Sequence, residues 1–117
     1  MRIAIIGSRK CDALSVEEVI ARIPENCTEI ISGGAEGVDR LAREAAHRCG
    51  IPLREFLPDY RTFGRKQAPL FRDNQIVEAA DEILAFWDYR SPGTRYTIIK
   101  AMREGKPVKI IPIAKEE

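Results

Sequence analysis

The chain has 117 residues, of which 44% are hydrophobic and 32% are charged, and its formal net charge is +1 at pH 7. This length suits one domain with its own hydrophobic core, so we expect residues 1–117 to form a single domain. No stretch approaches the roughly 18 apolar residues that cross a bilayer, the first residues do not resemble a secretion signal, and the balanced charge lacks the positive field of nucleic-acid-binding proteins. These features exclude a membrane protein and predict a cytoplasmic one for which no nucleic-acid partner is expected.

Short apolar runs alternate with helical patterns along the chain. Strands are predicted at residues 2–6, 28–32, 53–57, 82–87 and 107–112. Helices are predicted between them, over about 15–23, 38–50, 69–80 and 91–105, from apolar residues that recur every three or four positions. Ser15 followed by Glu18 is a capping-box pattern, and Ser91-Pro92 is typical of a helix start. The segment before Pro69, which contains Gly64, is predicted to be a loop.

This alternation predicts a fold class. Strands that alternate with helices are joined by right-handed crossovers, which place the strands parallel and the helices on both faces. We therefore predict an α/β, Rossmann-like three-layer sandwich with a five-stranded parallel sheet. Its edge strands and apolar helix faces would permit a homodimer.

The loops that follow the first, second and fourth strands are built from small residues. Ligands of such sheets bind beyond the carboxyl ends of the strands, where glycines let backbone N–H groups approach a phosphate at the start of a helix. Hydroxyl groups add donors, and nearby arginines add charge. The candidate ligand-binding residues in these loops are Gly7, Ser8, Arg9, Ser32, Gly33, Gly34, Ala35, Gly37, Ser91, Gly93 and Thr94.

Four residues outside these loops are further candidates. Asp39 lies in a first helical turn, where a carboxylate either stabilises the helix or accepts a hydrogen bond from a ribose hydroxyl or a base. Arg72 is a second candidate to neutralise the phosphate, and Asn74 lies beside it. Trp87 ends a strand and either stacks on a base or fills the core.

Other chemistry-bearing residues form no recognisable set. Cys11, Cys27 and Cys49 are too far apart for a zinc or redox motif and are predicted to be reduced, and the role of Cys11 is open. His47 is the single histidine and is predicted to lie on the surface. No metal site, no Ser-His-Asp set and no cofactor are expected.

The joint pattern of four segments resembles the SLOG superfamily, which includes the DNA-processing protein DprA and the LOG enzymes. The segments are IIGSR at 5–9, ISGGAEGVDRLAREAAHRCGI at 31–51, RDN at 72–74 and FWDYRSPGT at 86–94. Their order and spacing look most like small, stand-alone members of the YspA type. That resemblance implies a Rossmann-like fold and a nucleotide-derived ligand.

The resemblance also implies two alternatives. LOG enzymes cleave the N-glycosidic bond of a nucleoside monophosphate with a glutamate, whose position in this chain holds Thr97. A threonine cannot act as a carboxylate acid or base, so a hydrolase would need another carboxylate, such as Glu36, Asp39 or Asp88. The DprA branch implies binding of single-stranded DNA. The main prediction is binding, with sensing or processing, of a nucleotide-like small molecule held by the Gly33-Gly34 and Gly93-Thr94 loops.

Overall fold

Five parallel strands form one sheet in the order β3-β2-β1-β4-β5 in the structure, a computed structural model that describes residues 1–114. The strands are β1 (Arg2–Gly7), β2 (Glu29–Ser32), β3 (Leu53–Glu55), β4 (Glu82–Trp87) and β5 (Val108–Pro112). Strand order reverses next to β1, whose two neighbours are β2 and β4. The predicted α/β, Rossmann-like fold with a five-stranded parallel sheet is confirmed.

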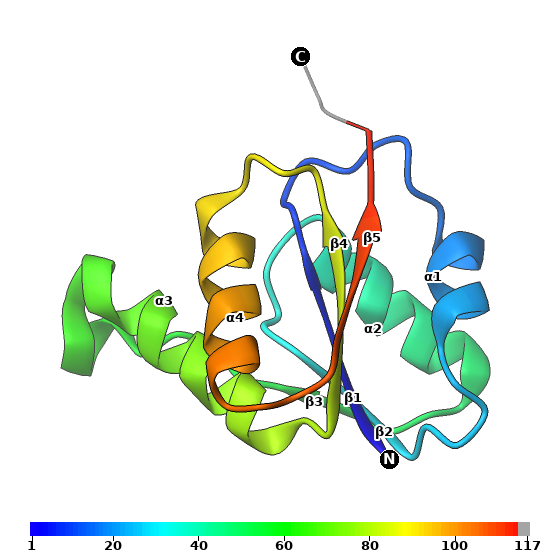
Figure 1. The fold of residues 1–117 in the computed structure, drawn as a ribbon, viewed down its shortest axis with the longest axis horizontal. Coiled ribbons are helices and arrows are strands. Elements are labelled where there is room, and N and C mark those ends of the chain that lie inside the picture. The colour runs from blue at the N-terminus through cyan, green and yellow to red at the C-terminus, as the bar shows by residue number, and fades with distance from the viewer. Residues whose placement is uncertain (115–117) are drawn as a thin grey trace.

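Helices cover both faces of the sheet. Figure 1 shows the sheet nearly edge-on, with α1 (Val16–Arg22) and α2 (Val38–Cys49) on one side and α3 (Tyr60–Ala79) and α4 (Pro92–Arg103) on the other. In the described part of the chain, no helix has the length and apolar character of a membrane span. The three layers place the helix starts at the carboxyl edge of the sheet, where a ligand would bind.

The apolar strands are buried on both faces, as their continuous hydrophobic runs predict. Ile3 and Ile5 of β1 pack in a core with α1 and α2, whereas Ala4 and Ile6 of the same strand pack in a second core with α3 and α4. The pleat of a strand sends successive side chains to opposite faces, which explains this division. The two cores hold the loops after β1 and β4 in fixed positions.

The predicted helix starts agree with the structure. Ser15 and Glu18 form a complete capping box at α1, in which each side chain bonds the other residue's backbone. Ser91 is the N-cap of α4 and Pro92 its first residue. Proline at this position costs little, because its missing N–H would have no partner inside the helix.

The loop predicted before Pro69 is wrong, because this segment is the first part of α3. The side chain of Asp59 accepts a hydrogen bond from the Thr62 amide and begins the helix at Tyr60. Gly64 interrupts it with a non-helical backbone, φ 79° and ψ 176°, a region open mainly to glycine. Pro69 therefore lies inside α3 and does not begin it.

Candidate functional site

A cavity of about 120 Å³ lies at the point where strand order reverses. Crevices at this point are where open parallel sheets bind ligands. The loops after β1, β2 and β4 contribute to its wall, and α3 and α4 close its side. Its lining residues are Ile6, Gly7, Arg9, Gly33, Ala35, Glu36, Asp39, Pro69, Arg72, Asp73, Ile76, Ser91, Gly93, Thr94 and Thr97.

The N-terminus of α4 opens into this cavity without a side-chain cap. The hydroxyl of Ser91 lies 3.2 Å from the Thr94 hydroxyl and makes no hydrogen bond to a backbone N–H of the first turn. Asp88 fixes the preceding turn, because its Oδ1 accepts hydrogen bonds from the amides of Arg90 (2.8 Å) and Ser91 (2.9 Å). The amides of Gly93 and Thr94 are thus available to an anion, which the helix dipole would also favour.

The N-terminus of α2, in contrast, is filled by the protein itself. The amide of Val38 donates to the carbonyl oxygen of Ser8 over 3.2 Å. This close approach requires a glycine at position 37. Gly37 has a φ of 71°, and a Cβ at this position would collide with the carbonyl oxygens of Ser8 and Arg9. Protein oxygens therefore already occupy the start of α2, whereas the start of α4 has no side-chain cap.

Arg72 and Asp73 form an ion pair deep in the cavity wall. Arg72 Nε donates to Asp73 Oδ1 over 2.8 Å, and Arg72 Nη1 donates to the carbonyl oxygen of Gly33 over 2.8 Å. The two side chains are only 11% and 12% exposed. Burial raises the pKa of Asp73, although the charge of Arg72 opposes the rise. Arg72 thus holds α3 against the loop after β2.

Asp39 is a second buried carboxyl group at the same cavity. Its Oδ2 accepts a hydrogen bond from the amide of Ala35 over 3.1 Å, which fixes the loop that precedes α2. Burial raises the pKa of Asp39, the positive charge of Arg72 lowers it, and the nearby carboxyl of Asp73 raises it. Asp39, Arg72 and Asp73 line the same cavity, and we call this cluster the acidic floor.

Arg9 is the exposed cation of the site. It follows β1, lies at the cavity wall and has no hydrogen bond or ion pair from its side chain to another residue within the described range 1–114. Arg9 also lines two neighbouring hollows on the surface. Unlike Arg72, it keeps its guanidinium available for a phosphate.

The cavity brings together most of the residues that the sequence singles out. It contains Gly7, Arg9, Gly33, Ala35, Asp39, Arg72, Ser91, Gly93 and Thr94. The sequence does not single out Asp73, although this residue lies between two candidates, Arg72 and Asn74. A buried carboxyl carries no local signal, and only its ion pair with the adjacent Arg72 identifies it.

The other candidates lie around the cavity without lining it. The hydroxyl of Ser8 accepts from the Asp88 amide, Asn74 accepts from the Tyr96 hydroxyl, and the Trp87 indole donates to the Ser91 carbonyl. Gly34 and Gly37 border adjacent hollows. Ser32 is wholly buried, and its hydroxyl makes no hydrogen bond of ordinary geometry within the described residues.

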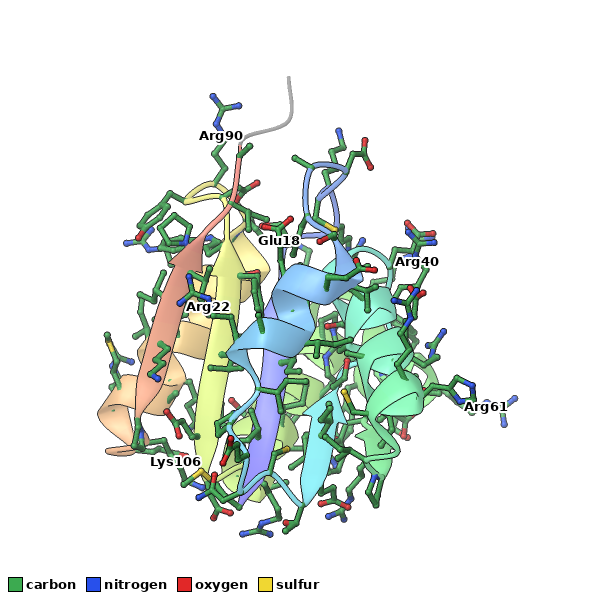
Figure 2. The ribbon with its side chains drawn as sticks, turned by 90° about the vertical axis from the view of Figure 1, so that its right-hand side faces the viewer. Glu18, Arg22, Arg40, Arg61, Arg90 and Lys106 are labelled. Atoms are coloured by element: carbon green, nitrogen blue, oxygen red, sulfur yellow. The ribbon has the colours of Figure 1, made fainter. Side chains whose placement is uncertain are left out.

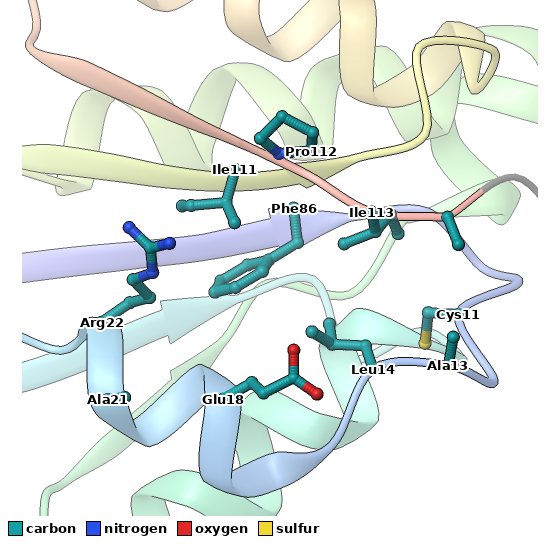
Figure 3. Close-up of a pocket in the computed structure, with 11 residues that line it drawn as sticks. Cys11, Ala13, Leu14, Glu18, Ala21, Arg22, Phe86, Ile111, Pro112 and Ile113 are labelled. Carbon is teal, nitrogen blue, oxygen red and sulfur yellow. The ribbon is translucent and has the colours of Figure 1, made fainter.

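A larger hollow, of about 390 Å³, lies on the other side of the sheet between α1 and β5. Figure 3 shows Phe86, Ile111 and Leu14 around it, with Glu18 and Arg22 at its edge. It has neither a glycine loop nor the start of a long helix. Its apolar lining makes it a poor phosphate site, so the smaller cavity carries the candidate chemistry.

The described residues contain neither a candidate metal site nor a disulfide. No group of three or more histidine, cysteine or carboxylate side chains in residues 1–114 could hold a metal ion. The three cysteines form no disulfide, and Cys11 is buried while Cys49 is exposed. His47 is exposed on α2, as predicted.

Comparisons with solved structures show the same fold. DNA processing protein A from Streptococcus pneumoniae matches with 25% identity and a TM-score of 0.78, over 95% of this chain and 50% of that protein. DNA processing protein A from Helicobacter pylori, described for its single-stranded DNA binding mode, matches with 23% identity and a TM-score of 0.78, over 100% of this chain and 67% of that one. The structural genomics target TM1055 matches with 21% identity and a TM-score of 0.68, over 92% of this chain and 71% of that one.

The present chain spans about half the length of the pneumococcal protein. A search of curated proteins finds no significant match. The family model for the YspA, cpYpsA-related SLOG family matches residues 1–63, more than half of the chain. This segment contains the loops after β1 and β2 that carry Arg9, Gly33 and Asp39. The chain therefore belongs to the YspA, cpYpsA-related SLOG family.

Proposed function

We propose that this protein binds a nucleotide or a nucleotide-derived phosphate ligand in the cavity at the strand-order reversal. The open N-terminus of α4 would hold the phosphate through the amides of Gly93 and Thr94, and Arg9 would neutralise it. The observation that carries the proposal is this uncapped helix end, which faces the same cavity as an arginine whose side chain has no protein partner in the described residues. Fixed N–H donors and a guanidinium are the usual partners of phosphate.

A ligand panel followed by thermal denaturation tests this proposal. The panel contains nucleoside 5′-mono-, di- and triphosphates, ADP-ribose, the matching nucleosides and inorganic phosphate. A ligand that binds only the folded state stabilises it, by about 2.7 kcal/mol at a hundred times its Kd. We expect at least one phosphorylated compound to raise the Tm while its nucleoside does not. If no phosphorylated compound raises the Tm at millimolar concentration, the proposed function is wrong.

Hydrolysis of a nucleotide is a second candidate, and the position of Asp73 favours it. Asp73 and Thr97 line the same cavity, and the Thr97 side chain lies close enough to lower the pKa of Asp73. A carboxyl group is therefore present beside the position where the family resemblance implies a glutamate. Burial raises its pKa, which is the direction of shift that a carboxyl acting as a general acid requires. Chromatography of nucleoside monophosphates incubated with the protein would show released base if this activity exists, and D73N should abolish the release.

Binding of single-stranded nucleic acid is a third candidate, favoured by the likeness to DNA processing protein A. Figure 2 shows Arg90 beyond the carboxyl ends of the strands and Arg40 at the side of the molecule near the same end. Both side chains are exposed, and Arg9 lies between the hollows that they border. Nucleic-acid binding predicts an affinity for dT oligonucleotides that rises with length and falls steeply with salt. Full competition by a mononucleotide, with no effect of length, would exclude it.

A further inference from the structure

Tyr89, in the loop between β4 and α4, has a strained backbone. Its φ is 64°, and no other residue besides glycine has a positive φ in the described range 1–114. A bulky side chain rarely adopts this conformation, because its Cβ comes too close to the following carbonyl oxygen. Such strain is concentrated at binding sites, where the surrounding structure maintains it. A glycine would adopt the same backbone without strain, so the strain points to a use for the tyrosine side chain.

Hydrogen bonds on both sides of Tyr89 hold this conformation. Asp88 Oδ1 accepts hydrogen bonds from the amides of Arg90 and Ser91, which closes the turn around Tyr89. The Asp88 amide donates to the hydroxyl of Ser8 over 3.3 Å, which ties the turn to the loop after β1. The hydroxyl of Tyr89 has no hydrogen-bond partner within residues 1–114. Asp88 and Ser8 therefore fix the turn, and the Tyr89 side chain adds no polar contact to it.

The ring of Tyr89 is exposed and lies against the indole of Trp87. Of the Tyr89 surface, 54% is exposed. The two ring centroids are 4.5 Å apart, with an angle of 30° between the ring planes. Trp87 is half-buried at the end of β4, and its indole N–H donates to the Ser91 carbonyl over 3.0 Å. The indole thus fixes the orientation of the tyrosine ring, while the exposed part of the ring is open to a ligand.

This aromatic pair adjoins the start of α4, where the proposed phosphate subsite lies. Ser91, which accepts the hydrogen bond from Trp87, is the N-cap of α4. The two neighbours of Tyr89 in the sequence, Asp88 and Arg90, line a hollow of about 440 Å³ that Arg9 and Gly93 also line. In a nucleotide, a single pentose separates the base from the 5′-phosphate. A base that leaves the α4 start through this hollow therefore reaches the loop that carries Tyr89.

We propose that Tyr89, supported by Trp87, is the platform on which the base of a nucleotide ligand stacks. This inference rests on the proposed function and adds the subsite for the base. Every base has a π-face, so an aromatic platform accepts both purines and pyrimidines. Because the ring is already held in place, stacking orders little additional structure. The site thus binds a nucleotide through its base as well as through its phosphate.

The test compares ligands with and without a base. Isothermal titration calorimetry measures the binding of AMP, GMP, CMP, UMP and ribose 5-phosphate to the natural protein. Stacking of one base strengthens binding about tenfold or more, so the tightest nucleotide should bind at least about tenfold tighter than ribose 5-phosphate. Y89A should reduce this advantage to about threefold or less and leave the Kd of ribose 5-phosphate unchanged. Y89F keeps the ring and should keep the full advantage. F71A removes an exposed ring of α3 and is the matched control, with the full advantage expected.

The fluorescence of Trp87 gives a second measurement that needs no variant, because this residue is the only tryptophan of the chain. A base stacked on Tyr89 lies beside the indole and should change its emission, whereas ribose 5-phosphate should not. Unchanged emission at a saturating nucleotide concentration would overturn the inference, even if Y89A did not fold.

The variant Y89G separates a binding role of the ring from a structural one. Glycine relieves the backbone strain, so Y89G should keep or raise the Tm and lose the advantage of the base. A lower Tm together with an undiminished advantage would show that the ring only covers Trp87, which overturns the inference.

The outcomes also separate this inference from the proposed function. Equal affinity for ribose 5-phosphate and all four nucleotides, or a full advantage retained by Y89A, overturns the base platform and leaves the phosphate site intact. If neither ribose 5-phosphate nor any nucleotide binds, both proposals fail.

Discussion

Arg72 Nη1 donates a hydrogen bond of 2.8 Å to the carbonyl oxygen of Gly33, which joins the middle of α3 to the loop after β2. The two residues are far apart in the sequence, and this contact makes one wall of the cavity continuous. A Cβ on Gly33 would lie 2.6 Å from Arg72 Nη1, so the close approach depends on glycine. The Arg72 guanidinium is therefore a structural link between α3 and this loop.

The first prediction concerns this link. R72A removes the partner of Asp73 and leaves a largely buried carboxylate unpaired, which should lower the free energy of unfolding by roughly 3 kcal/mol. Urea denaturation measures the change. R61A, an exposed arginine of the same helix, is the matched control and should change stability by no more than about 0.5 kcal/mol. Equal stability of the two variants would contradict the assigned role.

The position of Arg72 can be predicted from the sequence, but the direction of its side chain cannot. The segment R-D-N at 72–74 is predictable as part of the site, because its place in the chain puts it near the strand ends. The sequence does not reveal that Arg72 turns toward the protein and that Asp73 is its buried partner. These directions depend on how α3 packs on the sheet, and this packing is set by contacts distant in sequence.

The second prediction uses two glycines of the site with opposite surroundings. G37A should be strongly destabilising, since Gly37 has a φ of 71° and a Cβ there would collide with backbone atoms of Ser8 and Arg9. We expect a loss above about 2 kcal/mol from the combined strain and clash. G93A should be neutral or slightly stabilising, because Gly93 lies in α4 and a Cβ at this position would meet no other atom within 4 Å. Thermal denaturation of both variants measures the difference, and equal Tm values would contradict it.

The course of α3 shows a second limit of prediction. Gly64 and the basic residues around it are typical of a loop, and Pro69 is typical of a helix start. The segment is nevertheless helical, because Asp59 caps the start of α3 and because only Gly64 departs from helical backbone angles. Phe63 and Phe71 also stack across the break, with ring centroids 4.1 Å apart. By comparison, the strands and the starts of α1 and α4 are predictable, because continuous apolar runs and capping residues act locally.

The third prediction is a pH dependence. Burial raises the pKa of Asp39 above the roughly 3.9 of an unfolded chain, so the protonated form is favoured by folding. The stability that this group contributes is present below the unfolded pKa and is lost as the pH rises through the folded pKa. D39N cannot ionise and does not lose it. Relative to the natural protein, D39N should therefore become more stable as the pH rises above about 4, the ordinary pKa of the group.

Urea denaturation of both proteins across this range measures the difference. E78Q controls for the general effect of removing one negative charge, since Glu78 is exposed. A constant difference between D39N and the natural protein, or one that favours the natural protein more at higher pH, would show that Asp39 is not held in a site that penalises its charge.

The contact between Arg9 and the ligand phosphate is the central claim, and a cycle of four titrations tests it most directly. Isothermal titration calorimetry measures AMP and adenosine binding to the natural protein and to R9A, with R103A as an exposed control on α4. A charge-assisted phosphate contact contributes about 1.5–3 kcal/mol, so R9A should weaken AMP binding by roughly ten- to a hundredfold. Adenosine binding, which lacks the phosphate, should not change. If R9A weakens both ligands equally, or if AMP binds the natural protein no tighter than adenosine, the proposed contact between Arg9 and a ligand phosphate is wrong.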